Sequence, residues 1–317
     1  MEVFTKNRLD LRAVCLAVLW CFCSVLGADC MAQDKAEIMQ SRIDSAAVHF
    51  WASVNLSDAA LYEVPQSVEE EEGFSAMEEK AAEFFTLLPA ASEPAVVQAV
   101  NILMDRALEE DLRDASGQKS GSDVYGFFMA AAEKYFYSVE SPYYNESLLL
   151  HFFAHKIRRT DMAEIEKSRE KYLSALIRRN MVGSKAEDFA LTMGGKPESL
   201  YGVIGQLTER QSVMLVFFSA GCADCIRGIT RLKYSAVLSR AVAEGEMAVL
   251  AVCTEGNVAD VLDLMPDSWA VALDGGSLRG GQLYSMRHTP SVYVLDRNAE
   301  VLLKDADVSS AIDFLLK

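Results

Sequence analysis

The sequence predicts an all-α N-terminal domain followed by an α/β domain, and three observations support this fold class. The chain has 317 residues, about twice the usual domain size, which favours two domains. Apolar residues recur at helical spacing through the first part of the chain, whereas short apolar runs alternate with helical stretches in the last part. The helical pattern ends at Met181, Val182 and Gly183, and we place the domain boundary there.

Composition and charge exclude several classes of protein. Apolar residues make up 51% of the chain and charged residues 24%, as in globular proteins and unlike disordered, collagen-like or polytopic membrane proteins. Acidic residues outnumber basic ones 46 to 30, which gives a net charge of -16. Because such a chain repels a phosphate backbone, we expect no nucleic-acid partner.

Residues 1–32 have the layout of a secretory signal peptide. Three basic residues precede an uncharged run over residues 13–28 that is too short to span a bilayer comfortably. Cleavage after Ala28 or Ala32 fits the small residues there. A buried N-terminal helix is the alternative, and a lipid anchor is disfavoured by the large or acidic residue ahead of each N-terminal cysteine. We therefore expect an exported protein of the periplasm or cell envelope, with no membrane span in the mature chain.

Residues 33–182 predict helices that each bury one apolar stripe. Two stripes have apolar residues three and four positions apart: Ala81, Phe84, Phe85 and Leu88, and Val96, Val97, Val100, Met104 and Leu108. A last helix is expected over residues 161–180, capped by Thr160 and ending in two arginines. The acidic run over residues 69–72 is typical of a solvated loop or a helix start, with a cation site as the alternative.

Residues 183–317 predict an α/β domain. Continuous apolar runs over residues 212–218, 247–253 and 291–295 are typical of strands buried on both faces. Helical stretches are expected over residues 223–243 and 258–265. Strands that alternate with helices imply βαβ units around a mostly parallel sheet.

Cys222 and Cys225 are separated by two residues and follow the first predicted strand, at the opening of the next helix. Unpaired N–H groups and the positive dipole end at a helix N-terminus lower the pKa of the first cysteine and favour its thiolate. Cys222 would then attack a disulfide, and Cys225, one turn on and less exposed, would resolve the mixed disulfide. Half of a zinc site is the alternative, but such a site needs two further ligands.

The remaining cysteine and histidines offer weaker candidates. His151 and His155 would share one helix face, and we favour surface or interface side chains over zinc ligands. Cys253 ends an apolar strand and is expected to be a buried, inert thiol. No metal site is therefore expected.

Thr289 and Pro290 stand just ahead of the predicted strand over residues 291–295, a position where proline is permitted. Alone, the pair is an ordinary turn. A cis proline there would form a tight turn and leave the Thr289 backbone free to pair with an extended substrate.

Residues 183–317 resemble the thioredoxin-like fold in its periplasmic form. GSKAEDFALTMGGKPESLYG resembles the first hairpin, LVFFSAGCADC the redox strand and loop, HTPSVYVLD the cis-proline segment, and AEVLLKDAD the closing strand. Residues 33–182 resemble the helical module of unknown function that precedes such a domain in exported proteins of Bacteroidota, through EKYFYSVESPYYNE and IRRNMVGSKAEDFAL.

This resemblance implies a set of roles. Cys222 would be the nucleophile and Cys225 the resolving thiol, with Pro290 the cis proline and Thr289 beside it. The chain would need no cofactor beyond a redox-active Cys222–Cys225 disulfide. Its partners would be protein thiol or disulfide clients and an upstream thiol reductant.

Three positions depart from the thioredoxin pattern. Thioredoxins carry an acidic residue six positions before the first cysteine, where this chain has Val216, so the proton of Cys225 would pass to Asp224, to water or elsewhere. Gly221 replaces a common tryptophan, which predicts a more mobile loop. The Asp224 carboxylate is expected to raise the pKa of Cys222 and so disfavour the reduced state, which predicts a reductant or isomerase poise.

Two functional classes follow. The first is an exported thiol:disulfide oxidoreductase whose helical domain positions a client or an electron donor. The second is an envelope module that binds a partner through the helical domain and uses the thioredoxin fold mainly as a scaffold. Val216 and the size of the helical domain motivate the second class.

Overall fold

The computed structural model describes residues 35–63, 74–116, 123–138, 141–208, 210–278 and 283–316. The chain divides into two compact units between His155 and Lys156. The predicted signal peptide over residues 1–32 and the acidic run over residues 69–72 lie outside the described residues. Of the helices that are described, none has both the length and the apolar character needed to cross a membrane.

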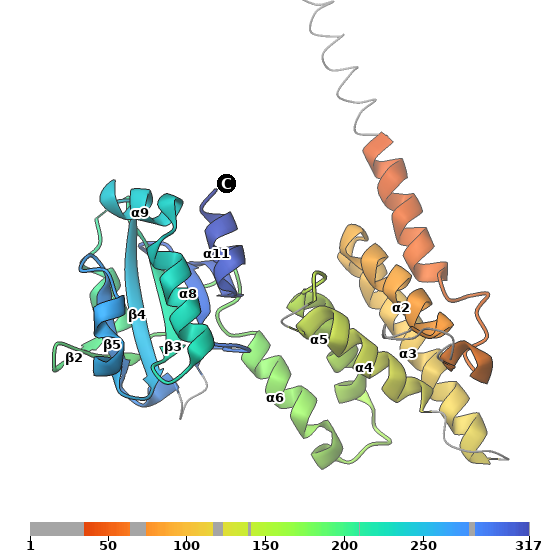
Figure 1. Cartoon of the computed structure of the whole chain (residues 1–317). Coiled ribbons are helices and arrows are strands. Elements are labelled where there is room, and N and C mark those ends of the chain that lie inside the picture. The colour runs from red at the N-terminus through yellow and green to blue at the C-terminus, as the bar shows by residue number, and fades with distance from the viewer. Residues whose placement is uncertain are drawn as a thin grey trace, which may run out of the picture. The chain divides into compact units, whose positions relative to one another are not determined.

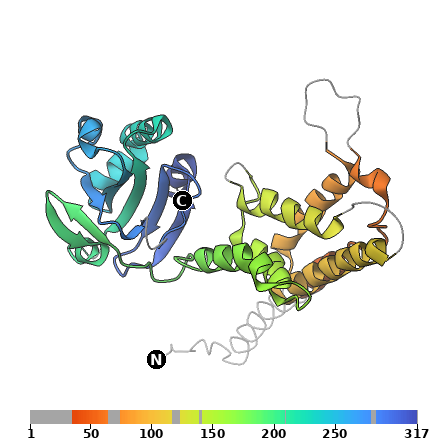
Figure 2. The same cartoon turned by 90° about the horizontal axis from the view of Figure 1, so that it is seen from below.

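The first unit is built from helices (Figure 1). They are a helix over residues 35–49, the 3-10 helices η1 (Ala59–Tyr62) and η2 (Leu88–Ala90), and the α-helices α2 (Ala76–Leu87), α3 (Glu93–Ser116), α4 (Val124–Tyr137) and α5 (Glu146–Arg158), the last of which crosses the division. Figure 2 shows α3 as the long gold helix of this unit. The predicted all-α character of this region is confirmed.

Aromatic side chains form the core of the first unit. Trp51 makes edge-to-face contacts with Phe84 and Phe128, with ring centroids 5.5 and 5.1 Å apart. The first predicted stripe is buried in full, whereas in the second stripe Val97 and Leu108 are only half-buried. Helix ends are capped locally, as where the Ser75 side chain accepts a hydrogen bond from the N–H of Glu78 at the start of α2.

The single helix expected over residues 161–180 is wrong in its bounds. The structure has the 3-10 helix η3 (Glu164–Lys167) and the α-helix α6 (Ser168–Ile177), both in the second unit. The start lies after Thr160 because the Glu166 side chain accepts a hydrogen bond from the N–H of Ala163 at 2.8 Å. The helix stops early because Asn180 adopts a left-handed φ of 51° and its side-chain amide donates to the carbonyl of Leu283 at 2.7 Å.

The rest of the second unit is a twisted sheet with helices packed against it (Figure 1). Its elements are β1 (Ala190–Met193), β2 (Lys196–Ser199), α7 (Leu200–Ile204), β3 (Ser212–Ser219), α8 (Ala223–Lys233), α9 (Ala236–Ala243), β4 (Met247–Glu255), η4 (Val258–Asp260), η5 (Leu262–Leu264), β5 (Ala270–Asp274), β6 (Ser291–Leu295), β7 (Val301–Ala306) and α11 (Val308–Phe314). The three predicted strands are confirmed as β3, β4 and β6. Each predicted helical stretch is divided in two, the first because Ser235 caps a new helix by accepting from the N–H of Leu238.

The sheet is mixed, so the expectation of a mostly parallel sheet is wrong. Within the described residues the strand order is β2-β1-β5-β4-β3-β6-β7. Among the strand pairs of the described residues, only β3–β4 and β4–β5 are parallel. A tight turn at Gly194 and Gly195, both with positive φ, joins β1 to β2, and a short turn joins β6 to β7; short connections of this kind require antiparallel neighbours.

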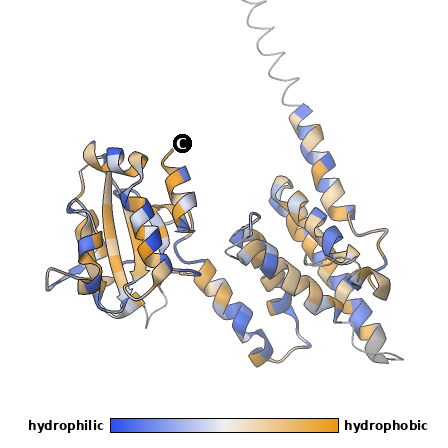
Figure 3. Cartoon of the chain, in the orientation of Figure 1, coloured by the Kyte–Doolittle hydropathy of each residue, from blue (hydrophilic) through white to orange (hydrophobic). Residues whose placement is uncertain are grey.

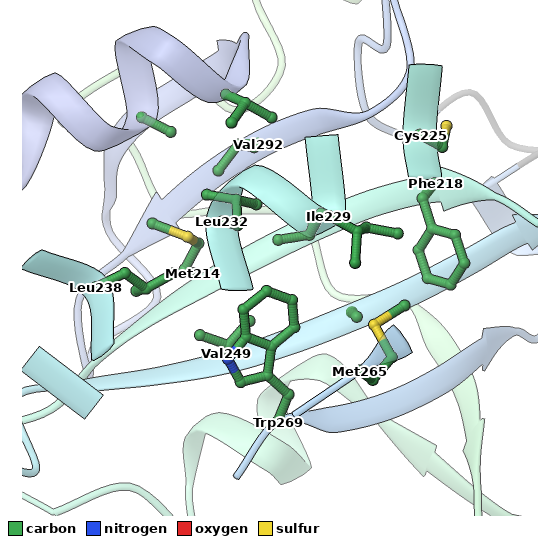
Figure 4. Close-up of a cluster of buried hydrophobic side chains, with 14 of the residues drawn as sticks. Met214, Phe218, Cys225, Ile229, Leu232, Leu238, Val249, Met265, Trp269 and Val292 are labelled. Atoms are coloured by element: carbon green, nitrogen blue, oxygen red, sulfur yellow. The ribbon is translucent and has the colours of Figure 1, made fainter. Parts of the chain in front are cut away.

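Both faces of β3 are buried, because its alternate side chains enter two separate cores. Met214, Val216 and Phe218 pack with α8, α9 and α11, and Val213, Leu215 and Phe217 pack on the opposite face. Figure 4 shows part of the first core, in which Ile229 and Leu232 of α8 pack against side chains of β3 and β4. The central strands are accordingly hydrophobic along most of their length (Figure 3). This packing places the start of α8 at the end of β3.

Candidate active site

Cys222 is the N-cap residue of α8. Its backbone is extended, with φ -94° and ψ 120°, and its Sγ accepts a hydrogen bond from the N–H of Cys225 at 3.3 Å. The side chain is partly exposed. The sulfur therefore occupies the position where a helix leaves N–H groups free and favours negative charge.

The two sulfurs have pKa values shifted in opposite directions. The pKa of Cys222 is lowered, first by the N–H of Cys225 and then by the Cys225 side chain. Burial raises this pKa and so opposes the shift. The N–H of Asp224 and the side chain of Thr289 lower it further. Cys225 is 0% exposed, and burial raises the pKa of its thiol to about 11, although the N–H of Ser219 donates to its Sγ at 3.4 Å. A thiolate thus forms on the accessible sulfur while the buried one keeps its proton.

The predicted cis-proline segment lies against this pair. The peptide bond between Thr289 and Pro290 is cis, and Pro290 is buried. The Thr289 side chain lies close enough to both sulfurs to lower the pKa of Cys222 and of Cys225. The structure therefore brings the four residues predicted for catalysis and substrate binding together, although the sequence interpretation gave Thr289 a role through its backbone and did not foresee its hydroxyl.

Gly228 contributes to the site and was not singled out from the sequence. A Cβ at this position would lie 2.5 Å from Cγ of Pro290 and 3.1 Å from Cγ2 of Val308. Glycine therefore allows α8 to approach the cis-proline segment closely. The available signal was a glycine inside an amphipathic helix, three residues after Cys225, where glycine has a cost in helix stability.

Asp224 does not have the expected effect on Cys222. Its carboxylate forms an ion pair with Arg227, one turn along α8, and both side chains are 70% exposed. The only contribution of Asp224 to the pKa of Cys222 is its N–H, which lowers it. A neighbouring guanidinium and solvent therefore screen the carboxylate, and the reductant or isomerase poise stays a prediction.

Gly221 and Val216 are the other two positions that depart from the thioredoxin pattern. A Cβ at Gly221 would meet no atom within 4 Å, so packing does not require glycine at this position. Val216 is 0% exposed and lies in the apolar core beneath α8. No carboxylate therefore occupies the position of the acidic residue of thioredoxins, and Asp224, at the surface, does not replace it.

The residues weighed as metal ligands have protein partners. In the first unit, His151 Nε2 lies 3.2 Å from Glu93 Oε1, and His155 lies between Asp105 Oδ1 at 2.9 Å and the Tyr125 hydroxyl at 3.0 Å. The described residues contain no group of three or more His, Cys, Asp or Glu that could hold a metal ion. Cys253 is buried, as expected, and its Sγ donates to the carbonyl of Glu255.

Comparisons with known proteins match both halves of the chain. Residues 37–180 match the model of DUF5106, described as a domain of unknown function. No curated protein matches the chain. Among solved structures, a thioredoxin-like protein from Bacteroides caccae covers 87% of this chain and 93% of its own, with a TM-score of 0.70 and 24% identity. Because 87% of the chain is longer than either compact unit, the matched region includes parts of both units.

Other solved structures match about two-fifths of the chain. The C-terminal domain of an uncharacterized protein from Bacteroides fragilis covers 44% of this chain and 99% of its own, with 26% identity and a TM-score of 0.40. The thioredoxin domain of a thiol-disulfide oxidoreductase from Bacteroides vulgatus covers 43% and 98%, with 16% identity and a TM-score of 0.32. The chain thus carries a DUF5106 domain followed by a domain of thioredoxin-like fold.

Proposed function

We propose that the protein is an exported thiol:disulfide oxidoreductase in which Cys222 attacks client disulfides and Cys225 resolves the product. The observation that carries this proposal is the contrast between the two sulfurs. Cys222 is partly exposed and its pKa is lowered, whereas Cys225 is buried with a pKa of about 11. Attack needs an accessible thiolate, and resolution needs a nearby thiol that does not react first.

The reaction balances in two exchanges. The Cys222 thiolate attacks one sulfur of a client disulfide, a new S–S bond forms, the client's S–S bond breaks, and the departing client thiolate takes up a proton. The Cys225 thiol then passes its proton to water and attacks Cys222 Sγ, which leaves a Cys222–Cys225 disulfide and releases the second client thiolate, which takes up a proton from water. The client is reduced by two electrons and the protein is oxidised by two. An upstream thiol reductant would restore the pair, and every step also runs in reverse.

The substrate-binding role belongs to the segment at Thr289 and Pro290. The side chain of Thr289 lies beside both sulfurs, where it lowers their pKa values, so we expect an incoming disulfide that reaches Cys222 to pass beside this residue. An extended client segment could pair with the free backbone groups there. The expected clients are therefore proteins with accessible disulfides or thiols, held briefly by main-chain hydrogen bonds.

The direction of electron flow follows from the reduction potential. The reductant or isomerase poise depended on Asp224, whose charge is neutralised by Arg227. A lowered pKa at Cys222 stabilises the reduced form and moves the potential in the oxidising direction. Localisation in the periplasm or cell envelope rests on the predicted signal peptide over residues 1–32.

Mixed-disulfide trapping tests this proposal. The Cys225→Ser variant, incubated with a disulfide-bonded model client such as insulin, is expected to accumulate a covalent complex through Cys222, seen on a non-reducing gel and located by mass spectrometry. The matched control carries both Cys222→Ser and Cys225→Ser and should form none. Absence of a complex with the single variant would refute an oxidoreductase role.

One observation favours a second candidate, an envelope module that binds a partner and uses the thioredoxin fold as a scaffold. Val216 is fully buried where thioredoxins carry a proton acceptor, which would slow resolution by Cys225. The same trapping experiment separates the two. A scaffold would form no mixed disulfide with Cys225→Ser, whereas a slow enzyme still would.

A further inference from the structure

One buried carboxylate fixes both ends of the segment that carries Thr289. Asp305 lies in β7 and is 0% exposed. Its Oδ2 accepts hydrogen bonds from Nε of Arg287 at 2.8 Å, the N–H of Arg287 at 3.3 Å and the hydroxyl of Ser285 at 3.1 Å. Its Oδ1 accepts from the hydroxyl of Ser291 at 2.7 Å. Residues 287 and 291 are thus tied to one side chain.

The guanidinium of Arg287 makes a further hydrogen bond to the same strand. Its Nη2 donates to the backbone carbonyl of Asp305 at 2.9 Å, and the arginine side chain is only 9% exposed. Asp305 itself has a left-handed φ of 45°, unusual for a residue with a side chain inside a strand. A buried ion pair and a strained backbone both have a cost in free energy. Since buried pairs are weak evidence for stability, this arrangement points to a role in placing the segment.

The residues between the two ties contact the redox pair. Pro290 lies against α8 where Gly228 leaves room, and the Thr289 side chain beside it lowers the pKa of Cys222 and of Cys225. A shift of the segment by a fraction of an ångström would change the distance between the Thr289 side chain and the Cys222 sulfur. Asp305 itself contacts the segment, and no hydrogen bond links it to either sulfur among the described residues.

We propose that Asp305 is a positioning residue, whose buried carboxylate holds Arg287 and Ser291 and thereby keeps the Thr289 side chain against the sulfurs of Cys222 and Cys225. The inference builds on the proposed function, since it concerns the same reactive thiol. It does not depend on turnover, because the thiolate of Cys222 can be measured without any client.

Alkylation of the reduced full chain by iodoacetamide tests the proposal. The rate at Cys222, followed by mass spectrometry over a range of pH, gives the pKa of that thiol. Asp305→Asn keeps the size of the side chain and removes its charge. We expect the pKa of Cys222 to rise by about 0.3 to 0.5 unit, which slows alkylation below the midpoint about twofold to threefold. An unchanged midpoint in the folded variant would overturn the proposal.

A double-mutant cycle shows whether Asp305 acts through Thr289. Thr289→Val removes the hydroxyl and keeps the shape, so it should raise the pKa of Cys222 by itself. Asp305→Asn introduced into Thr289→Val should then add nothing, because the hydroxyl that Asp305 positions is already gone. Shifts that add in full would mean that Asp305 acts by another route and would refute the positioning role.

Two further variants separate positioning from folding. Glu170→Gln breaks another buried ion pair of the same unit, with Lys156 at 2.8 Å, and should lower stability without changing the pKa of Cys222. If Asp305→Asn does not fold, Ser291→Ala removes a single tie and should produce a smaller rise in the same direction. No change in Ser291→Ala, or an equal change in Glu170→Gln, would overturn the proposal.

Discussion

The start of α8 and the end of β7 each place an aspartate near the redox pair, and the two aspartates differ in almost every respect. Asp224 lies between the cysteines in the sequence, is 70% exposed and pairs with Arg227 on its own helix. Asp305 lies 80 residues after Cys225, is fully buried and binds Arg287 and Ser291, on either side of Thr289. A residue's distance from the cysteines along the sequence is therefore a poor guide to its effect on the redox pair. It suggests too large an effect for Asp224 and none for Asp305.

The two aspartates differ because one is exposed to solvent and the other is buried. Around Asp224, solvent and an exposed guanidinium screen the carboxylate, so we expect its charge to have little effect on the nearby sulfur. Around Asp305, no water competes, and each of its hydrogen bonds fixes a position in the segment. An exposed charge beside a reactive group can thus matter less than a buried charge that never contacts it.

Alanine at the two positions should give the largest contrast. Asp305→Ala leaves the guanidinium of Arg287 buried without its carboxylate, and we expect the free energy of unfolding to fall by about 3–5 kcal/mol. Asp224→Ala removes an exposed charge and should change it by less than about 0.5 kcal/mol. Urea unfolding followed by circular dichroism measures both, and equal losses would contradict the contrast.

Two glycines, Gly228 and Gly221, allow the same comparison between a buried and an open position to be tested through side-chain packing. Gly228→Ala adds a methyl group 2.5 Å from Pro290, so α8 and the cis-proline segment must move apart. We expect a loss of about 1–3 kcal/mol in unfolding free energy, and slower alkylation of Cys222. Gly221→Ala, which meets no atom within 4 Å, is the matched control and should leave both quantities nearly unchanged. A neutral Gly228→Ala would show that the close approach is dispensable.

The smallest effect is expected at Arg227. Arg227→Ala leaves the Asp224 carboxylate without its partner beside Cys222, and a negative charge near a thiolate raises its pKa. Because the site is exposed, we expect a rise of only about 0.1 to 0.3 unit in the alkylation midpoint, decreasing with added salt. Asp224→Asn combined with Arg227→Ala should restore the original midpoint. A fall in the midpoint with Arg227→Ala would contradict this account of Asp224.

The sequence predicted those features that depend on local pattern. The apolar runs of β3, β4 and β6 could be recognised because both faces of these strands are buried, and the cysteine pair because it follows β3 at a helix start. The spacing of Asp224 and Arg227 also allows an ion pair on one helix face, a signal that the sequence interpretation did not use.

The features that escaped prediction depend on tertiary contacts. The tie between Asp305 and Arg287 spans 18 residues and requires the register of β6 and β7, which the apolar pattern does not specify. The end of α6 was misplaced because Asn180 bonds Leu283, which lies 103 residues later. Gly228 has meaning only once Pro290 is known to lie against it.

Reduction of insulin by the purified protein tests the central claim most directly. With a thiol reductant present, the protein is expected to accelerate insulin precipitation, and Cys222→Ser should remove that acceleration because the attacking thiolate is lost. Cys253→Ser alters the other buried cysteine of the same core, whose Sγ donates to the carbonyl of Glu255, and should keep the activity. Full activity in Cys222→Ser, or none in the unaltered protein, would contradict the assignment of Cys222 as the nucleophile.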